Sequence, residues 1–318
     1  MSSGSSRTLA YVSSRDGISV IDTSINEVTA KIPLTNPGAL SVAPDGRRIY
    51  AGGVYTVSVI GTATNTVVAT VDMKPHIIGK GIVAPDGKHA YFATIIPVAG
   101  GVGAPDRPDT LRIMVLTTAT ETVAPSSIDV DQSGDAGGLA VSANGRFVYF
   151  ACASAVMVLD TTLNKIVAKI PVAAPGASQL KGLAITPDSK RAYVTDNFDQ
   201  VTVLDLTNNS VITSMKLPAH TGDLAGIAMS PSGASVFVIG TATTGTISVI
   251  DTATNTVKGT ISLPSYGPLV LAITPDGKTI YAGGGNNTSV FAVDVATGAV
   301  TDTLSLAADS IAIATVAA

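Results

Sequence analysis

Three features of the sequence predict an all-β fold built from copies of one four-stranded unit. A short apolar strand motif recurs seven times, one aromatic residue precedes each copy, and turn-forming residues separate the strands. Each repeat of roughly 40–45 residues has room for four short strands and none for a crossover helix. The sequence therefore predicts a seven-bladed β-propeller with four antiparallel strands in each blade.

The strand motif has the form V/I-x-V/A-I/L-D and defines the repeat. It keeps its final Asp in five copies and loses it in two. The five are Ile18–Asp22, Val156–Asp160, Val201–Asp205, Ile247–Asp251 and Val290–Asp294, and the two are Val57–Gly61 and Ile113–Thr117. Such short runs rich in β-branched residues are typical of strands buried on both faces.

One aromatic residue lies upstream of every copy of the motif. The seven are Tyr11, Tyr50, Tyr91, Tyr149, Tyr193, Phe237 and Tyr281. The steps between them are 39, 41, 58, 44, 44 and 44 residues, and the seven are half of the chain's aromatic residues, 8 Tyr plus 6 Phe. Chance would scatter these side chains, so the spacing indicates one structural position repeated in each blade.

Two kinds of turn separate the strands. Thr62–Thr66 and Thr252–Thr256 both read Thr-Ala-Thr-Asn-Thr, and Asn tolerates the left-handed backbone of a tight turn. The second kind is Pro-Asp-Gly or a variant of it, at residues 44–46, 85–87, 143–145, 187–189, 231–233 and 275–277. Proline presets φ at one corner and glycine allows a positive φ at another. Both kinds are expected on one face, where they are structural.

The two ends of the chain are expected to share one blade. The sequence opens with three strands, at residues 9–12, 18–21 and 28–32, and ends with a single strand at residues 310–316. Pairing the last strand with the first blade supplies a fourth strand and removes an exposed sheet edge. We therefore expect residues 7–318 to form a single seven-bladed propeller domain, preceded by a flexible tail of residues 1–6.

Composition narrows the classes of function. Hydrophobic residues make up 46% of the chain, which argues against disorder, and no apolar run reaches the length of about 18 residues that a membrane helix needs. The net charge is −4 and no Lys/Arg cluster is present, which argues against nucleic-acid binding. The single cysteine, Cys152, is expected to be an inert buried residue. We expect a monomer without a membrane span, a nucleic-acid partner, a metal or a cofactor.

The first six residues have neither the basic n-region nor the apolar h-region of a signal peptide. The chain as written is therefore expected in the cytoplasm, or outside it if a leader was removed.

One repeat resembles a known family. Tyr193-Val194-Thr195-Asp196, the strand Val201–Asp205 and the Pro-Asp turns together resemble the bacterial and archaeal YVTN propeller repeat, over about residues 7–316. Asp196 stands where the family repeat ends in Asn. The resemblance implies the propeller fold. Similar families include cell-surface repeat proteins, lactonases and subunits of redox enzymes, so the resemblance implies no single activity.

Any functional site is expected in the loops opposite the uniform turns. These loops vary in length and surround the predicted central channel, and the longest, Ile95–Thr110, extends the third repeat to 58 residues. A loop of this kind is either a tolerated surface insertion or a lid. The candidate catalytic residues are His76, His220 and Asp223 near the channel mouth, because a His beside an Asp can transfer protons.

Seven further residues are candidate ligand-binding groups on the same face. They are Arg15, Tyr55, Lys80, Asp135, Lys181, Asp196 and Tyr266. The alternative interpretation is that they are solvated loop residues or structural ion pairs. If they converge, they form a mixed-charge pocket suited to a small anionic or carbonyl ligand.

Three functions remain open at this point. The first is a ligand-binding protein with a small-molecule site at the channel mouth. The second is a metabolic enzyme, such as a lactone hydrolase, lyase or isomerase, that uses the same pocket. The third is a protein-interaction or cell-surface repeat scaffold. Only Tyr55, Phe198 and Tyr266 offer the aromatic anchors that a protein interface needs, which favours the pocket.

Overall fold

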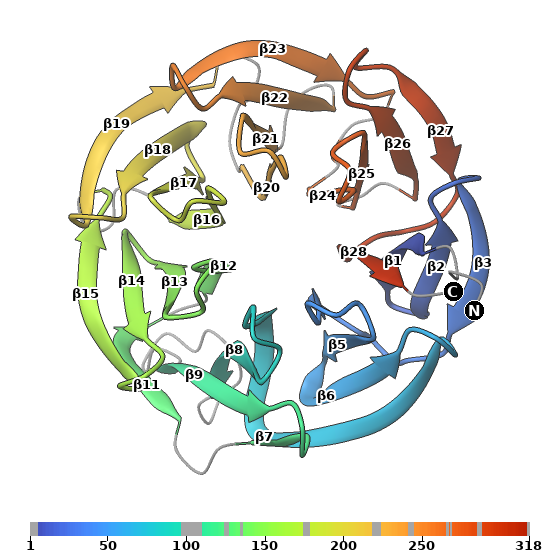
Figure 1. Ribbon diagram of the computed structural model, residues 1–318, viewed down its shortest axis with the longest axis horizontal. Coiled ribbons are helices and arrows are strands. Elements are labelled where there is room, and N and C mark those ends of the chain that lie inside the picture. Colours follow the sequence, from blue (N-terminus) through green and yellow to red (C-terminus); the bar gives the residue numbers. More distant parts are fainter. Residues whose placement is uncertain are drawn as a thin grey trace. The chain divides into compact units, whose positions relative to one another are not determined.

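The structure is a computed structural model that describes residues 6–96, 110–123, 127–133, 136–173, 179–217, 224–240, 245–264, 267, 269–284 and 288–316. These residues form 28 strands and no helix (Figure 1). In this part of the chain there is accordingly no helix long and apolar enough to span a membrane. The strands belong to two compact units, residues 1–135 with 309–318 and residues 136–308. The prediction of an all-β chain is confirmed.

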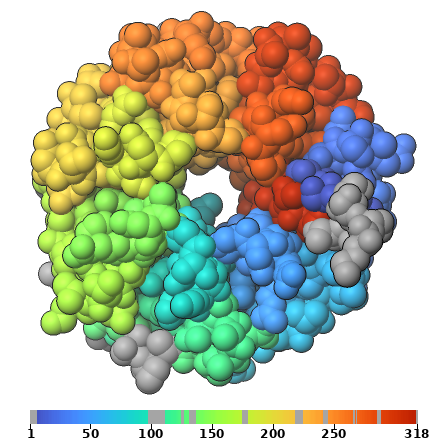
Figure 2. All heavy atoms as spheres, viewed as in Figure 1, coloured from blue at the N-terminus to red at the C-terminus, as the bar shows by residue number. Residues whose placement is uncertain are grey.

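The last strand of the chain pairs with the first. In spatial order, the strands of this sheet are β28 (Ser310–Val316), β1 (Arg7–Ser14), β2 (Gly17–Asp22) and β3 (Glu27–Ile32). β28 is antiparallel to β1, with Ala312 opposite Tyr11. Figure 1 shows β28 beside β1, and Figure 2 shows red C-terminal atoms against dark blue N-terminal ones. The prediction that the final strand completes the first blade is confirmed.

The next two predicted blades form one continuous sheet. Its strands are β4 (Leu40–Val42), β5 (Arg48–Gly52), β6 (Val54–Gly61), β7 (Thr66–Val83), β8 (His89–Ile96), β9 (Thr110–Thr117), β10 (Thr122–Val123) and β11 (Ile128–Ser133). They run in order from β4 to β10, and β11 also pairs with β9. Seven separate sheets were predicted. The described residues form five four-stranded sheets and this eight-stranded one, because β7 stays extended and pairs with β6 and then with β8.

The second unit consists of four sheets whose strands follow chain order (Figure 1). The first two contain β12 (Ala136–Val141), β13 (Phe147–Cys152), β14 (Ala155–Asp160) and β15 (Lys165–Pro171), then β16 (Leu180–Ile185), β17 (Arg191–Asp196), β18 (Gln200–Asp205) and β19 (Ser210–Lys216). The other two contain β20 (Gly226–Met229), β21 (Ser235–Ile239), β22 (Thr246–Asp251) and β23 (Thr256–Ser262), then β24 (Val270–Ile273), β25 (Thr279–Gly283), β26 (Val290–Asp294) and β27 (Val300–Leu304). All neighbouring strands within these sheets are antiparallel, as the sequence predicts.

Hydrogen bonds join the two kinds of turn within a sheet. The motif Asp shapes the turn that follows it, since Asp205 Oδ1 accepts the backbone N–H of Thr207 at 2.8 Å. The Thr after the motif position reaches the Pro-Asp-Gly type of turn: Thr62 Oγ1 donates to the carbonyl of Gly46 at 2.7 Å, and Thr252 Oγ1 donates to that of Gly233 at 2.6 Å. The two kinds of turn therefore lie side by side, as predicted.

The seven aromatic residues that precede the copies of the strand motif, called the register aromatics, are core residues. Each is at most 3% exposed, and they lie on β1, β5, β8, β13, β17, β21 and β25. By contrast, the fourth strands are largely exposed, as in β3, β19 and β23. Because the second and third strands of each sheet are packed with apolar side chains, polar groups able to do chemistry are found mainly at the strand ends.

Candidate functional site

The predicted site residues are divided between the two units, and some fall outside the described residues. Those outside are Asp135, His220, Asp223, Tyr266 and residues 97–109 of the third-repeat loop. Arg15, Tyr55, His76 and Lys80 belong to the first unit, and Lys181 and Asp196 belong to the second. The pairing of His220 with Asp223 and the lid therefore stay predictions.

Five of the predicted residues lie in strands rather than in the expected loops. His76 and Lys80 lie within β7, Tyr55 lies in β6, Lys181 lies in β16 and Asp196 is the last residue of β17. The expected loop before the third repeat is absent because Ile77 pairs with Val54 of β6 and with Ile95 of β8. The sheet thereby uses backbone polar groups that a loop would expose to solvent.

A row of polar side chains crosses four neighbouring strands of the eight-stranded sheet. His76 lies on β7, Thr94 on β8, Arg112 on β9 and Asp129 on β11. Thr94 is directly opposite Arg112, and Arg112 is directly opposite Asp129. These four residues are called the polar row below. The row lies where β8 ends and β9 begins, which is where the sequence predicts the longest variable loop.

His76 is the buried member of the polar row. It is 7% exposed, and its Nδ1 lies 3.1 Å from Thr94 Oγ1. The Thr94 hydroxyl donates to the carbonyl oxygen of Arg112 at 3.3 Å, so its oxygen is left to accept a hydrogen bond from His76. This arrangement favours the tautomer with the proton on Nδ1, and it leaves Nε2 as a hydrogen-bond acceptor.

The environment keeps the His76 ring neutral. Burial lowers the pKa of His76 from its ordinary value of 6.5, and the positive charge of Arg112 lowers the pKa further. Both effects disfavour the imidazolium form, so the neutral ring predominates at pH 7. A neutral imidazole of this tautomer can accept a hydrogen bond or a proton at Nε2.

Arg112 supplies the positive charge of the polar row. Its Nη1 donates to the hydroxyl of Ser127 at 2.9 Å, and its Nε lies 3.0 Å from Asp129 Oδ1. The Asp129 contact is an ion pair without an aligned hydrogen bond, because Nε finds no partner of suitable geometry. The Asp129 side chain is 70% exposed, so this pair is held weakly and an anion from solvent can compete for the guanidinium.

Tyr55 lies next to the polar row, on β6. Val54 pairs with Ile77 and Thr56 pairs with Asp72, so Tyr55 is opposite the irregular part of β7 that contains His76. Its φ of 65° is a left-handed value that is rare for an aromatic residue and is found at bulges of this kind. Two of the predicted residues, Tyr55 and His76, thus lie on paired strands at the irregular stretch between β6 and β7.

Two other predicted residues of the first unit are exposed. Arg15 lies in the turn between β1 and β2, where its carbonyl accepts the N–H of Asn36 at 3.1 Å. Lys80 lies on β7 opposite Ala93. Sequence reasoning did not select Thr94 and Arg112, which act on His76, or Ser127, which bonds to Arg112.

In the second unit, Lys181 and Asp196 lie at the same end of the sheet from β16 to β19. The Nζ atom of Lys181 is 3.5 Å from Gln179 Oε1. Asp196 is buried, and its Oδ1 accepts the backbone N–H groups of Phe198 and Gln200 at 2.8 and 3.0 Å. This carboxylate oxygen therefore shapes the turn between β17 and β18.

The described residues contain no group of three His, Cys, Asp or Glu side chains placed to hold a metal ion. Cys152 is fully buried at the end of β13, and burial raises the pKa of its thiol to about 11. The thiol is therefore protonated at neutral pH and is not a nucleophile in the folded chain.

The fold is a β-propeller. It is defined by the four-stranded antiparallel sheets, by the turns that recur from sheet to sheet and by the pairing of the two chain ends. Such a fold is a generic scaffold for binding ligands or proteins at the strand ends. No family model matches the chain, and no curated protein matches its sequence. Kuenenia stuttgartiensis hydrazine synthase has a similar structure, with a TM-score of 0.71 and 18% sequence identity, covering 94% of this chain and 92% of that chain. As many as 1752 solved chains match, so this likeness shows the fold and leaves the function to be argued from the site.

Proposed function

We propose that this protein binds a small hydroxy acid at the polar row. One observation carries the proposal: a buried, neutral His76 contacts the hydroxyl of Thr94, which donates to the main-chain carbonyl of Arg112, a residue whose side chain is partly exposed. Burying polar groups costs free energy unless they are fully paired, so such a cluster in a sheet is a candidate binding site.

The chemistry of the row selects the ligand class. The guanidinium of Arg112 is planar and suits a carboxylate, which would replace the loosely held Asp129. Nε2 of His76 is an acceptor and therefore requires a donor on the ligand, such as a hydroxyl group. A carboxylate together with a hydroxyl group satisfies both. A ligand carbonyl cannot bond to Nε2 directly, because both are acceptors, so a carbonyl ligand would need a water molecule between them.

The position of the proposed site, at the end of the strand β8 that contains Tyr91, is one of those expected from the sequence. Membership of the YVTN family is part of the same proposal. The resemblance in repeat pattern supports a propeller with variable loops and does not specify the ligand.

Three matched probes test the proposal. Lactate carries the carboxylate and the hydroxyl, propionate carries only the carboxylate, and 2-propanol carries only the hydroxyl. We expect lactate to bind about tenfold more tightly than propionate, because a hydrogen bond to a buried group contributes about 1.4 kcal/mol. Two-dimensional NMR of ¹⁵N-labelled protein measures the dissociation constants of lactate and propionate and locates the shifted residues.

Two variants separate the site from general charge effects. Arg112→Met removes the guanidinium and is expected to abolish lactate binding. Arg146→Met is the matched control, because Arg146 is an exposed arginine that also forms an ion pair, with Asp160 at 3.4 Å, in the second unit. Equal lactate affinity in both variants, or lactate shifts that avoid β7, β8 and β9, would remove the polar row as the site.

A second function is favoured by the tautomer of His76. With Nε2 unprotonated, the ring can take a proton from a water molecule that attacks a lactone carbonyl, and can return the proton to the ring oxygen when the C–O bond breaks. The product of that reaction is a hydroxy acid, the class of ligand proposed above. Hydrolysis of γ-butyrolactone in a pH-stat tests this enzyme, and a rate that is unchanged in His76→Gln rules it out.

A further inference from the structure

Three turns in the described chain share four of their five residues. Residues 62–66 and 252–256 read Thr-Ala-Thr-Asn-Thr, whereas residues 118–122 read Thr-Ala-Thr-Glu-Thr. The fourth residue is left-handed in all three, with φ of 52° at Asn65, 53° at Glu121 and 55° at Asn255. The backbone is therefore the same, and the difference lies in the side chain.

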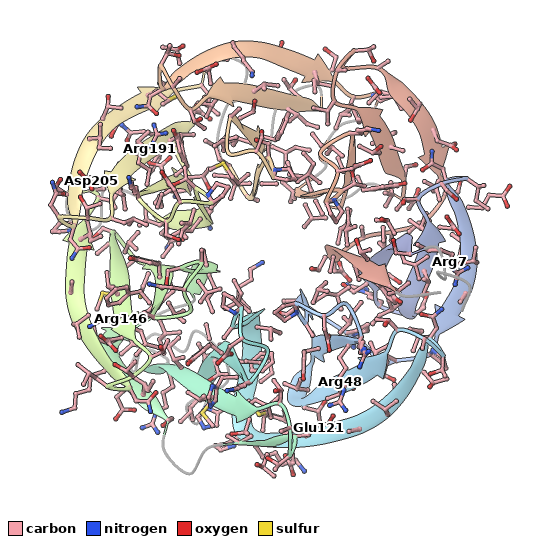
Figure 3. All side chains as sticks on the ribbon, viewed as in Figure 1. Arg7, Arg48, Glu121, Arg146, Arg191 and Asp205 are labelled. Atoms are coloured by element: carbon pink, nitrogen blue, oxygen red, sulfur yellow. The ribbon has the colours of Figure 1, made fainter. Side chains whose placement is uncertain are left out.

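The two Asn residues accept a tyrosine hydroxyl, whereas at the Glu121 turn the tyrosine is hydrogen-bonded to Arg48. Asn65 Oδ1 accepts the hydroxyl of Tyr11 at 2.8 Å, and Asn255 Oδ1 accepts that of Tyr193 at 2.6 Å. The equivalent tyrosine beside Glu121 is Tyr50. Glu121 instead pairs with Arg48, as Figure 3 shows with both residues labelled.

A cavity of about 550 Å³ lies beside the turn that contains Glu121. Its walls include Asp45, Arg47, Arg48, Tyr50, Asp86 and Thr118. The successive Pro-Asp-Gly type turns are farther apart here than in the second unit. A Cβ atom added to Gly87 would lie 3.9 Å from Pro44 Cδ, but a Cβ on Gly233 would lie 2.8 Å from Pro187 Cδ.

The cavity walls carry both signs of charge. Asp45 Oδ1 accepts the N–H of Arg47 at 3.0 Å, and Asp86 Oδ1 accepts the N–H of Lys88 at 2.9 Å. Among the described residues, the second oxygen of each carboxylate forms no such turn bond. The Arg48 guanidinium is compensated by Glu121, whereas that of Arg47 forms no ion pair within the described residues. One guanidinium and two carboxylates are therefore available to a ligand.

We infer that this cavity binds a small zwitterion, with its carboxylate on Arg47 and its ammonium group between Asp45 and Asp86. A ligand with only a negative charge would meet two carboxylates, and one with only a positive charge would meet Arg47. A zwitterion with its charges a few bonds apart satisfies both. The site belongs to different strand ends and different residues from the polar row, so it does not depend on the function proposed there.

Three four-carbon probes test the charge requirement. γ-Aminobutyrate carries both charges, butylamine carries only the ammonium group, and butyrate carries only the carboxylate. Isothermal titration calorimetry on the full chain is expected to show γ-aminobutyrate binding at least tenfold more tightly than either of the others. Equal binding of butylamine or butyrate, or no binding of γ-aminobutyrate, overturns the inference.

The variant Glu121→Asn tests the origin of the cavity. It recreates the contact in which Asn255 accepts from Tyr193 in the second unit. The other contact there, from Arg191 to the carbonyl of Thr252, already has its counterpart, since Arg48 Nη1 donates to the carbonyl of Thr118 at 3.3 Å. We expect this variant to unfold at higher urea concentration than the parent and to lose γ-aminobutyrate binding at least tenfold. Binding that survives in Glu121→Asn contradicts the inference.

A second pair of variants identifies the ammonium partner. Asp86→Asn keeps an oxygen to accept the Lys88 N–H but removes the charge, and is expected to weaken γ-aminobutyrate binding at least tenfold. Asp276→Asn is the matched control, because Asp276 accepts the N–H of Lys278 in the same way in the second unit. Equal affinity in Asp86→Asn and Asp276→Asn would contradict the inference.

Discussion

The hydroxyl group of Tyr11 donates a hydrogen bond to Asn65 Oδ1 at 2.8 Å, and so connects β1 of one sheet to the turn between β6 and β7 of the next. Burial raises the pKa of Tyr11 to about 12, so the hydroxyl remains protonated and able to donate. The same contact recurs in the second unit between Tyr193 and Asn255. Tyr11 and Tyr193 therefore both fill the core and tie successive repeats together.

Tyr193→Phe removes only the hydroxyl of this contact. We expect a loss of about 1 kcal/mol in the free energy of unfolding, because Asn255 loses its donor while the ring still fills the core. Urea unfolding measures the change. Phe237→Tyr is the control: the turn position that would accept its hydroxyl is Gly298, which has no side chain, so no gain is expected. A gain there, or no loss in Tyr193→Phe, would show that the hydrogen bond contributes nothing.

The pairing of β28 with β1 is tested by two neighbouring residues on opposite faces of β28. Ala314 is 1% exposed and Thr315 is exposed. Ala314→Asp places a charge in the core and is expected to cost about 3 kcal/mol or more of unfolding free energy, whereas Thr315→Asp is expected to change it by less than about 0.5 kcal/mol. Equal midpoints of urea unfolding for the two variants would mean that the strand does not pack in this register.

Gly46 lies in the turn after β4, where its backbone comes close to the backbone of β28. Its φ is 67°, and a Cβ atom there would lie 1.9 Å from the carbonyl oxygen of Thr315. Gly46→Ala should therefore cost more than about 2 kcal/mol, from the left-handed backbone and the steric clash together. Gly259→Ala, with nothing within 4 Å of the added atom, is expected to be neutral or slightly stabilising in the same thermal melt.

Acid should weaken the protein through the Asp residues that end the strand motif. A hydrogen bond from the Thr207 hydroxyl is the largest effect that lowers the pKa of Asp205, and one from Thr297 does the same for Asp294. Because the folded pKa lies below the ordinary value of 3.8, this stabilisation is complete above that value and is lost as the pH falls through the folded pKa. We expect the urea midpoint to be level from pH 7 to about 5 and to fall below about 4.

Asp205→Asn provides the control for the acid effect, because Asn keeps an oxygen for the turn N–H and cannot titrate. Its urea midpoint should fall less between pH 5 and pH 3 than that of the parent chain. An identical fall in both proteins would assign the acid sensitivity to other groups.

The sequence was sufficient for the strands and turns because each depends on neighbouring residues. The motif, the register aromatics and the Pro-Asp-Gly type of turn all lie where they were predicted, and only β7 differs. Residues 72–80 contain two residues that disfavour a strand, Pro75 and Gly79. Pairing of Ile77 with strands on both sides outweighed that local preference.

The polar row could not be read from the sequence in the same way. His76, Thr94 and Arg112 are spaced 18 residues apart, which fits successive hairpin arms. Whether they meet depends on the register of each pair, and the irregular pairing of β7 with β6 and β8 shifts that register. The Glu121 turn could have been recognised from the sequence, because it has Glu where the two otherwise identical turns have Asn.

The tautomer and pKa of His76 are the most direct test of the proposed binding site. Long-range ¹H–¹⁵N NMR of the histidine rings, recorded from pH 5 to 8 with and without lactate, measures both. The proposal predicts a proton on Nδ1 at pH 7, a pKa below 6.5 and a change in the Nε2 shift when lactate is added. A proton on Nε2, or a His76 ring that titrates above 6.5 and ignores lactate, would contradict it.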